Sequence, residues 1–526
     1  MEATLASIGD QERPLKSSSL VRVEASPQGS VSDEAAGLEV LRAASKQNLD
    51  PKFRLIFGDS GNLAYHGLTS LDQGPSFGDL VVGARPDLMN CTAPVDPALT
   101  QLYQTLASSR HVGVDPEFGK DLLDCYFSYQ VFNTIDRSAF MRDMALGGTC
   151  FSDFLLVAIY SCGIRMIDGL EPDERQAHSE RFAQSSKDLL AQELDGSSKI
   201  ATVQGLLLLS WRECAVGEVS KGWTHTGLVG ATANRKRNKS LRVTSQAFRL
   251  IHDLGIHLAP DSIEGISGLS PEEKHIRERL FWSAVIWDKA ISLALGREPT
   301  FPPRKGHDPS MLVDFADDDE AWCPFYAHVS NRPAPLRAYT YAPKRQMDTF
   351  RHLAHLSVIL HDLITQIYSS DSELDEAQRQ EFCTSSQHRL QNLGESMAGS
   401  HQFSPGRPSP PPWIFMLLML YHATWILLHR PLVDKSEVTL SSVHVMRCLE
   451  HSTILNQMAV SYHATFARRL PYVAMYSAFV AMSLDVTLFR ADDVGEQVAA
   501  LDRVRSWNEV LRDVERNSES QYPPLA

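Results

Sequence analysis

The sequence of 526 residues lacks the closely spaced cysteine pairs of zinc-binding and redox motifs. It has eight cysteines, no two of them closer than twelve residues, which excludes a Cys-x2-Cys zinc or thioredoxin-type motif. Cys125, Cys162 and Cys214 lie within apolar helical patterns, where a buried and reduced thiol is expected. Reduced thiols are typical of the cytosol or the nucleus.

Long hydrophobic runs are also scarce. The first residues contain no apolar stretch of signal-peptide length. Only residues 413–428 raise the question of a membrane, and this segment has sixteen residues, His422 and Thr424 among them. Since a membrane span takes about 20 apolar residues, we expect a buried core helix there and no membrane association.

Positive charge is in deficit, because the net charge is −14. Such a chain does not bind nucleic acid through its overall field, so a DNA-binding face would need a local basic patch or a separate module.

Motifs of catalysis are missing as well. The sequence contains no G-x-S-x-G elbow, no Walker loop and no G-x-G-x-x-G after a strand. The histidine pairs 252/257 and 352/355 lack a converging set of carboxylates and thiols. The acidic run 317–320 leaves a remote alternative, an all-α, metal-dependent diphosphate enzyme of the terpene cyclase kind. Because the run sits between prolines and no second metal triad accompanies it, we expect a solvated loop, no enzymatic activity and no cofactor or metal.

What the sequence does have is helical periodicity, so the predicted fold class is all-α, a large helical bundle or array. Ser270 and Pro271 predict a helix start, and Gly296 predicts its end. No strand pattern stands out. The helices are expected at 115–131, 151–166, 180–194, 198–216, 222 onward, 270–294, 344–369, 375–396, 413–429, 441–466, 472–489 and 495–512.

The predicted organisation follows composition. We expect residues 1–50 to be disordered and residues 51–114 to be a loop-rich lead-in with a helical turn or two. A helical domain follows over 115–335, and a C-terminal helical half packed on it spans 336–526. The second half contains a Pro-rich connector at 401–412.

Several of these segments, in this order, resemble the fungal-specific transcription factor domain. This domain is the middle homology region of the fungal zinc binuclear cluster regulators. The resemblance covers about 300 residues and is carried by LLDCYFSYQVFNTIDRSAFMRD, FSDFLLVAIYSCGIR, TVQGLLLLSWRECAVGEVSKGWTHTG, AFRLIHDLGIHL and ERLFWSAVIWDKAISLALGREPTF.

The resemblance implies a nuclear regulator of transcription by RNA polymerase II, with no enzymatic activity. Its expected partners are the transcription machinery or co-regulators, and homo- or heterodimers are compatible with it. The gene set would be metabolic or secondary-metabolite. A ligand-sensing interaction module is an alternative, with segments 413–428 and 472–482 as candidate walls of a cavity. The family-motif residues are structural, namely Arg212, Glu213, Trp223, Arg279, Trp282, Asp288, Gly296 and Arg297.

Four of these residues are charged and interrupt apolar helices. An unpaired charge in a partly buried position costs several kcal/mol. We therefore expect interhelical ion pairs from Arg212, Glu213, Arg279 and Asp288. The alternative is that they extend to solvent.

The six-cysteine zinc cluster of the full-length regulators is not found in the sequence, and residues 1–50 contain no cysteine. We expect DNA to be contacted only through a module that lies upstream or is supplied by a partner. The alternative is a co-regulator without direct DNA binding.

The second departure from the family is an insert of eighteen residues, 229–246, which has no acidic residue. Its ends fit codons beginning GT and ending AG, so one hypothesis is a retained intron. Another is a nuclear-localisation or phosphate-contacting patch, and a third is a tolerated solvated loop. The patch consists of Arg235, Lys236, Arg237, Lys239 and Arg242.

Overall fold

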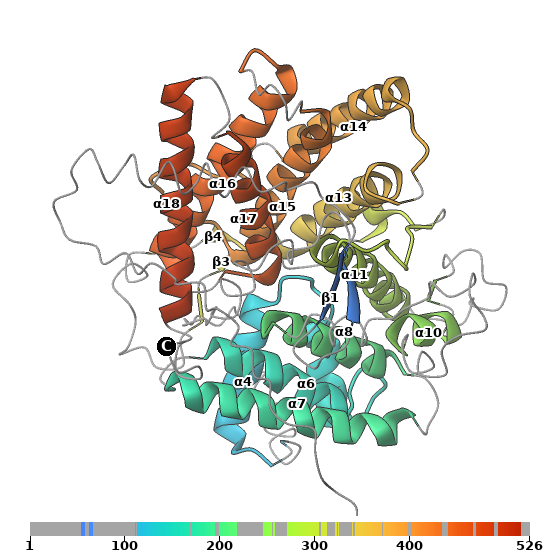
Figure 1. Cartoon of the computed structure of the whole chain (residues 1–526). Coiled ribbons are helices and arrows are strands. Elements are labelled where there is room, and N and C mark those ends of the chain that lie inside the picture. The colour runs from blue at the N-terminus through green and yellow to red at the C-terminus, as the bar shows by residue number, and fades with distance from the viewer. Residues whose placement is uncertain are drawn as a thin grey trace, which may run out of the picture. The chain divides into compact units, whose positions relative to one another are not determined.

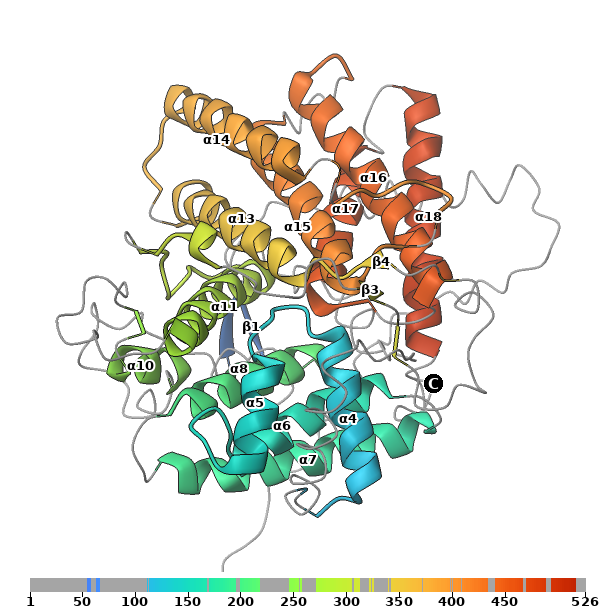
Figure 2. The same ribbon diagram turned by 180° about the vertical axis from the view of Figure 1, so that it is seen from behind.

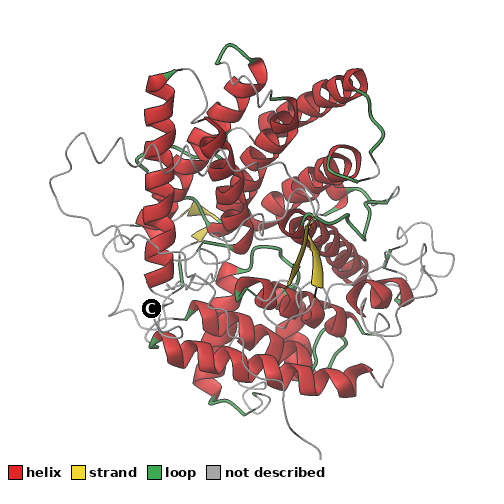
Figure 3. Ribbon diagram, in the orientation of Figure 1, coloured by secondary structure: helices red, strands yellow, loops and turns green. Residues whose placement is uncertain are grey.

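The computed structural model is an array of α-helices with two small, two-stranded antiparallel sheets in its described part (Figures 1 and 3). The chain divides into two compact units, residues 1–48 and 49–526, and all described residues belong to the second. These are 54–57, 63–66, 111, 113–167, 170–194, 199–217, 246–254, 256–257, 271–304, 307–312, 321–322, 324–325, 339, 342–370, 372–397, 399, 401–407, 409–433, 440–466, 470–488 and 493–516.

The first group of helices surrounds α6. Helix α6 (Asp153–Gly163) packs against α4, α7 and α8, and every one of its residues after Asp153 is buried. An apolar helix of this kind is stable only at the centre of other helices. The group comprises α4 (Pro116–Tyr129), α5 (Arg137–Leu146), α6, the 3-10 turn η2 (Ile164–Met166), α7 (Pro172–Leu194), α8 (Ile200–Ala215) and α10 (Gln246–Asp253).

The second group surrounds α15 (Pro412–His429), which packs against α13, α14, α16 and α17. The figures show these helices on the opposite side of α11 from the first group (Figures 1 and 2). The group comprises α13 (Gln346–Ile367), α14 (Glu376–Met397), α15, the 3-10 turn η8 (Arg430–Leu432), α16 (Val443–Phe466), α17 (Tyr472–Leu488) and α18 (Val494–Arg516).

Helix α11 (Pro271–Leu295) joins the two groups, because it contacts α8 in the first and α13 and α17 in the second. It begins and ends where the sequence predicts. The helix starts at Pro271, and after it Gly296 adopts a left-handed φ of 60°, which glycine tolerates best. A 3-10 turn, η6 (Pro309–Met311), follows and packs on α13. The domain boundaries drawn from composition stay predictions.

The apolar helix α15 is long and apolar enough to span a membrane by length and composition alone. In the structure, 89% of its apolar window is buried inside the protein. The expectation of a core helix is therefore confirmed.

Helices α5 and α7 differ from the sequence-based prediction. Helix α7 begins eight residues earlier than predicted, at Pro172, where Asp173 and Glu174 favour a helix N-terminus. The short helix α5 was not predicted, because its few apolar residues form no clear stripe.

Two short strands in the loop-rich lead-in were not predicted. There, β1 (Arg54–Phe57) pairs antiparallel with β2 (Leu63–His66). The connecting sequence GDSGN contains two glycines, which favour a hairpin, but strands of four residues are too short to reveal alternation. A second, two-stranded antiparallel sheet pairs β3 (Ala321–Trp322) with β4 (Ala342–Pro343).

The crossing of α4 and α6 depends on Gly163. A Cβ at this position would clash with the carbonyl oxygen of Leu122 on α4. Backbone cannot rotate away as a side chain can, so the two helices would have to separate.

We predict that Gly163→Ala lowers the free energy of unfolding by about 1–3 kcal/mol, the usual cost of overpacking a core. The matched control is Gly495→Ala, at the exposed start of α18, where the added methyl group meets only the Asp493 side chain. Because alanine is the better helix former, the control should be neutral or slightly stabilising. Urea unfolding of both variants measures the difference. Equal effects would contradict the role assigned to Gly163.

Candidate functional site

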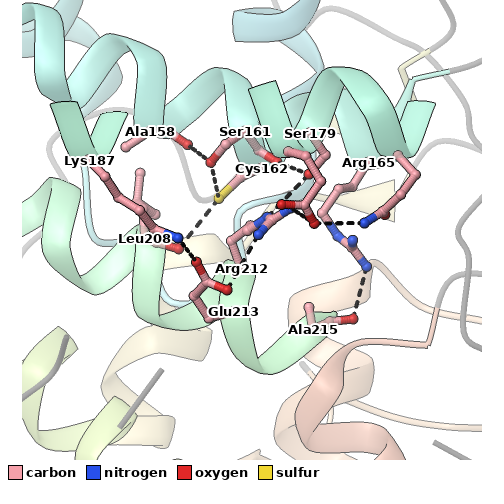
Figure 4. A network of polar contacts seen from close by, with 12 residues as sticks. Ala158, Ser161, Cys162, Arg165, Ser179, Lys187, Leu208, Arg212, Glu213 and Ala215 are labelled. Atoms are coloured by element: carbon pink, nitrogen blue, oxygen red, sulfur yellow. Dashed lines mark hydrogen bonds and ion pairs between the residues drawn. The ribbon is translucent and has the colours of Figure 1, made fainter. Parts of the chain in front are cut away.

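The last turn of α8 carries two charged residues into the core. Arg212 and Glu213 follow the apolar run LLLLSW, and each has only 1% of its surface exposed. They lie where α8 packs against α7, and Figure 4 shows Ser179 and Lys187 of α7 beside them.

Both residues make ion pairs to α7 (Figure 4). Arg212 Nη2 lies 2.7 Å from Glu180 Oε1, and its Nε donates a hydrogen bond of 3.3 Å to Ser179 Oγ. Glu213 Oε1 lies 2.7 Å from Lys187 Nζ, and its Oε2 lies 3.4 Å from Arg212 Nη1. The expected interhelical ion pairs are therefore present for Arg212 and Glu213.

The network continues to the C-terminal end of α6. Arg165 Nη2 donates to the carbonyl oxygen of Ala215, 2.9 Å away, at the C-terminus of α8. Burial, reinforced by the charge of Arg212, lowers the pKa of Arg165 to about 10, so the guanidinium stays charged at neutral pH. Ser179 Oγ donates to the Ser161 carbonyl oxygen at 3.2 Å. These contacts hold α6, α7 and α8 in one fixed position relative to one another.

Cys162 lies beside this network as a structural thiol. Its Sγ is 3.6 Å from the Leu208 carbonyl oxygen, and burial raises its pKa to about 12. The thiol is therefore protonated and unreactive at neutral pH, which agrees with the expected buried and reduced state.

On α11, Arg279 also makes the expected pair to another element. Its Nη1 lies 3.1 Å from Oδ2 of Asp136. Asp136 is the N-cap of α5 and accepts a hydrogen bond of 2.9 Å from the Ala139 amide. Burial raises the pKa of Asp136, but Arg279 and this amide outweigh it, so the pKa is lower than usual.

For Asp288 the expectation of an interhelical ion pair was wrong. Its carboxylate accepts hydrogen bonds from Thr300 N at 3.0 Å and Phe301 N at 3.1 Å, and it pairs with the adjacent Lys289 Nζ at 2.7 Å. The chain turns at Gly296 and returns along α11, which brings these amides to the carboxylate. Asp288 therefore fixes the loop after α11.

The remaining described motif residues also have architectural contacts. Trp282 is buried, and its Nε1 donates to Glu278 Oε1 at 2.9 Å. The backbone amide of Arg297 donates to the Ser292 carbonyl oxygen at 2.9 Å, which closes the helix end around Gly296. Trp223, the acidic run 317–320 and the basic residues Arg235, Lys236, Arg237, Lys239 and Arg242 lie outside the described residues.

Several members of these networks escaped the sequence reasoning. Lys187 and Ser179 lie on α7, and their contacts depend on the orientation of this helix about its own axis where it packs against α8. His307 Nδ1 lies 2.7 Å from Glu278 Oε2 and stacks on Phe281. No spacing rule connects residues so far apart in the chain.

One cavity lies between α4, α8 and α11, lined by Tyr126, Gln130, Trp211 and Trp287 among others. It holds about 20 Å³ of space for the centre of a water molecule. That volume suits about one water molecule. In this part of the described chain, the core has no room for a metabolite.

The network at the end of α8 yields a stability prediction. We expect Arg212→Met to lower the free energy of unfolding by about 3–5 kcal/mol, because it removes a buried guanidinium that pairs with both Glu180 and the buried Glu213. The matched control is Lys187→Met, which removes the other cation beside Glu213. The side chain of Lys187 is 32% exposed. A partly exposed pair contributes about 0–1 kcal/mol. Chemical unfolding of both variants measures the difference. An equal loss of unfolding free energy in the two variants would refute the importance assigned to burial.

The chain is similar to one known protein family and to several fungal proteins. The family model of the fungal specific transcription factor domain matches residues 123–396. An uncharacterized transcriptional regulatory protein of Schizosaccharomyces pombe is 28% identical over 325 residues, covering 60% of this chain and 48% of that protein.

Two further relatives are named as nitrogen assimilation transcription factors. The nirA protein of Emericella nidulans is 26% identical over 396 residues, 70% of this chain and 40% of its own length. The nit-4 protein of Neurospora crassa is 25% identical over 438 residues, 77% of this chain and 37% of its own length. The chain thus spans less than half the length of these relatives. No solved structure matches the chain.

The matched residues 123–396 cover α5 to α13 completely, together with half of α4 and nearly all of α14. They include both the α7–α8 network and the pair of Arg279 with Asp136. This chain belongs to the family of the fungal specific transcription factor domain.

Proposed function

We propose that the chain is a nuclear regulator of genes transcribed by RNA polymerase II, acting through its helical domain and without enzymatic activity. The observation that carries this proposal is the family match, which coincides with the helical array from α4 to α14.

A metabolic gene set is the second part of the proposal. Two relatives are named for nitrogen assimilation, and each covers at least 70% of this chain. These relatives are more than twice as long as the region they share with this chain, and the metabolic gene set is proposed from this shared region.

The polar groups of the described core support a regulatory rather than catalytic role. Arg212, Glu213 and Arg279 are neutralised by partners on neighbouring elements, and Asp288 holds a loop. Catalysis needs acids or bases that converge on a space where substrate fits. The cavity beside α4, α8 and α11 is too small for that.

For DNA, we propose contact through a module outside the described helices, either upstream or on a partner. The net charge of −14 disfavours direct binding through the overall field. The partners proposed for the helical domain are the transcription machinery, co-regulators or a second regulator of the same family.

A tethering experiment tests the proposal. The full chain, fused to a heterologous DNA-binding domain, should change transcription of a reporter gene several-fold in a fungal host. The Arg212→Met fusion should lose most of the effect, because its core is destabilised, whereas the Lys187→Met fusion should keep it.

Immunoblots establish equal amounts of each fusion. A full-chain fusion that leaves the reporter unchanged at equal protein level would argue against a role of this domain in recruiting the transcription machinery. A Lys187→Met fusion as weak as Arg212→Met would show that the effect does not follow the integrity of the α8 network.

The basic insert gives a separate prediction about location. Replacing Arg235, Lys236, Arg237, Lys239 and Arg242 together by Gln should shift a fluorescent fusion of the full chain from the nucleus to the cytoplasm, if this patch directs nuclear import. The control is Lys120→Gln combined with Arg505→Gln, which removes two exposed cations elsewhere. Unchanged nuclear fluorescence after the fivefold substitution would rule out the patch as an import signal.

A further inference from the structure

A group of one cysteine and two histidines lies where α14, α15 and α16 meet. Cys383 is in the middle of α14, His429 is the last residue of α15, and His444 is the second residue of α16. The three helices lie side by side in the second helical group (Figure 2). The potential ligand atoms of these three residues all lie within 4.8 Å of one another.

The distances between these atoms fit one small cation. Cys383 Sγ lies 3.8 Å from His429 Nδ1, which in turn lies 2.9 Å from His444 Nδ1. Around a tetrahedral zinc ion, the ligand distances place sulfur and nitrogen about 3.6 Å apart and two nitrogens about 3.3 Å apart. The observed separations therefore differ from a zinc site by only a few tenths of an ångström.

Burial and charge also suit a cation. Cys383 and His429 are 2% and 1% exposed, whereas His444 is half-buried and opens the group to solvent on one side. Glu376, at the start of α14, is close enough to raise the pKa of His444, although burial lowers it more. A divalent ion, one thiolate and this carboxylate would sum to zero charge.

A nearby cation, Arg447, is already engaged. Arg447 on α16 pairs with Glu450 at 3.0 Å and lies over the Trp425 ring, 5.8 Å from its centre. Burial lowers the pKa of His429 to about 4, with smaller contributions from the charges of His444 and Arg447. His429 is therefore neutral at neutral pH, which is the form of imidazole that binds metals.

The neighbouring histidine pair provides an internal comparison. His422 Nδ1 lies 2.8 Å from His451 Nδ1, the same geometry as the pair of His429 and His444. No cysteine completes a metal-binding set at this second pair among the described residues. What distinguishes the first pair is the thiol of Cys383, and thiolate with imidazole is a ligand set that favours zinc.

A second group, Asp348, His352 and His401, is less suited to a metal. Arg351 donates to Asp348 Oδ1 at 3.0 Å, and Thr349 Oγ1 lies 2.9 Å from His401 Nε2. Its carboxylate and imidazole thus already have partners other than a metal.

We propose that Cys383, His429 and His444 form a binding site for a zinc ion, with a water molecule in the fourth position. The site is separate from the six-cysteine cluster of the family and departs from the sequence-based expectation of no metal. A bound ion would clamp α14, α15 and α16 together. It would thereby couple the stability of the second helical group to the availability of zinc.

To bind a metal, the Cys383 thiol must first lose its proton. Burial raises the pKa of Cys383 to about 11, so its proton must leave when the ion arrives. The proton can reach solvent along the half-buried His444 side of the group.

The test uses the purified full chain, reduced and freed of metal by a chelator. Zinc is titrated in competition with a coloured chelator, and bound zinc is counted after gel filtration. We expect one ion per chain that Cys383→Ser and His444→Ala release. Loss of an outer-shell partner alone weakens metal sites by about 10–100-fold, so loss of a ligand should cost at least about 100-fold in affinity.

Two matched controls should keep the wild-type affinity. Cys150→Ser removes a buried thiol from the loop after α5, and His422→Ala breaks the histidine pair that has no thiol. With Co²⁺ in place of zinc, the wild type and both controls should show a thiolate-to-cobalt absorption band that Cys383→Ser lacks.

Thermal unfolding keeps the test decisive if Cys383→Ser is poorly folded. Zinc should raise the melting temperature of the wild type and of the controls but not that of His444→Ala, a substitution at a half-buried position. The proposal is overturned if the wild type retains no zinc, or if the ligand variants and the controls bind it equally well. These readouts are independent of transcription, so their failure leaves the proposed regulatory role untouched.

Discussion

The structure depends on pairing every charge that its apolar helices carry into the core. Helix α8 ends with Arg212 and Glu213 inside the protein, and α11 carries Arg279, Asp288 and Lys289 through it. Ionised groups lose several kcal/mol of hydration on burial, which only close partners can offset. Each of these five finds such a partner, and each partner lies in a particular helix or loop, so the pairs determine which packing of the helices is acceptable.

Apolar contact alone would not give that selectivity. Helices α6 and α15 are buried nearly all round and would pack against many apolar surfaces. The ion pairs between α7 and α8 and the Arg279 contact to the N-cap of α5 single out one rotation of each helix. The close approach at Gly163 adds a steric condition of the same kind, because only one crossing of α4 and α6 avoids the Leu122 carbonyl group.

The sequence predicted the helices far better than their partners. Periodicity with the signals at Pro271 and Gly296 located α11, because these effects act within a few residues. The need of Arg212 and Arg279 for partners was also predictable, but Glu180, Lys187 and Asp136 as the partners were not, since they depend on the rotation of packed helices. Asp288 was misjudged because its partners, Thr300 and Phe301, are backbone amides of a returning loop.

The proposed metal-binding residues show the same limit of prediction from sequence. Cys383 and His429 are 46 residues apart, and His429 and His444 are 15 apart, spacings that match no zinc motif. Only the meeting of three helices creates the group. Spacing rules detect ligands that share a turn or a hairpin, and they are blind to ligands gathered by tertiary packing.

The burial of the cysteines has a consequence for how the folded chain responds to oxidants and alkylating agents. All six cysteines among the described residues are buried, and burial raises the pKa of Cys150, Cys162 and Cys448 to about 12. The thiolate is the species that reacts. Burial therefore protects these thiols in two ways, because reagents cannot reach them and because they stay protonated. The rate at which such a reagent modifies a thiol therefore reports how often the helices separate locally and expose it.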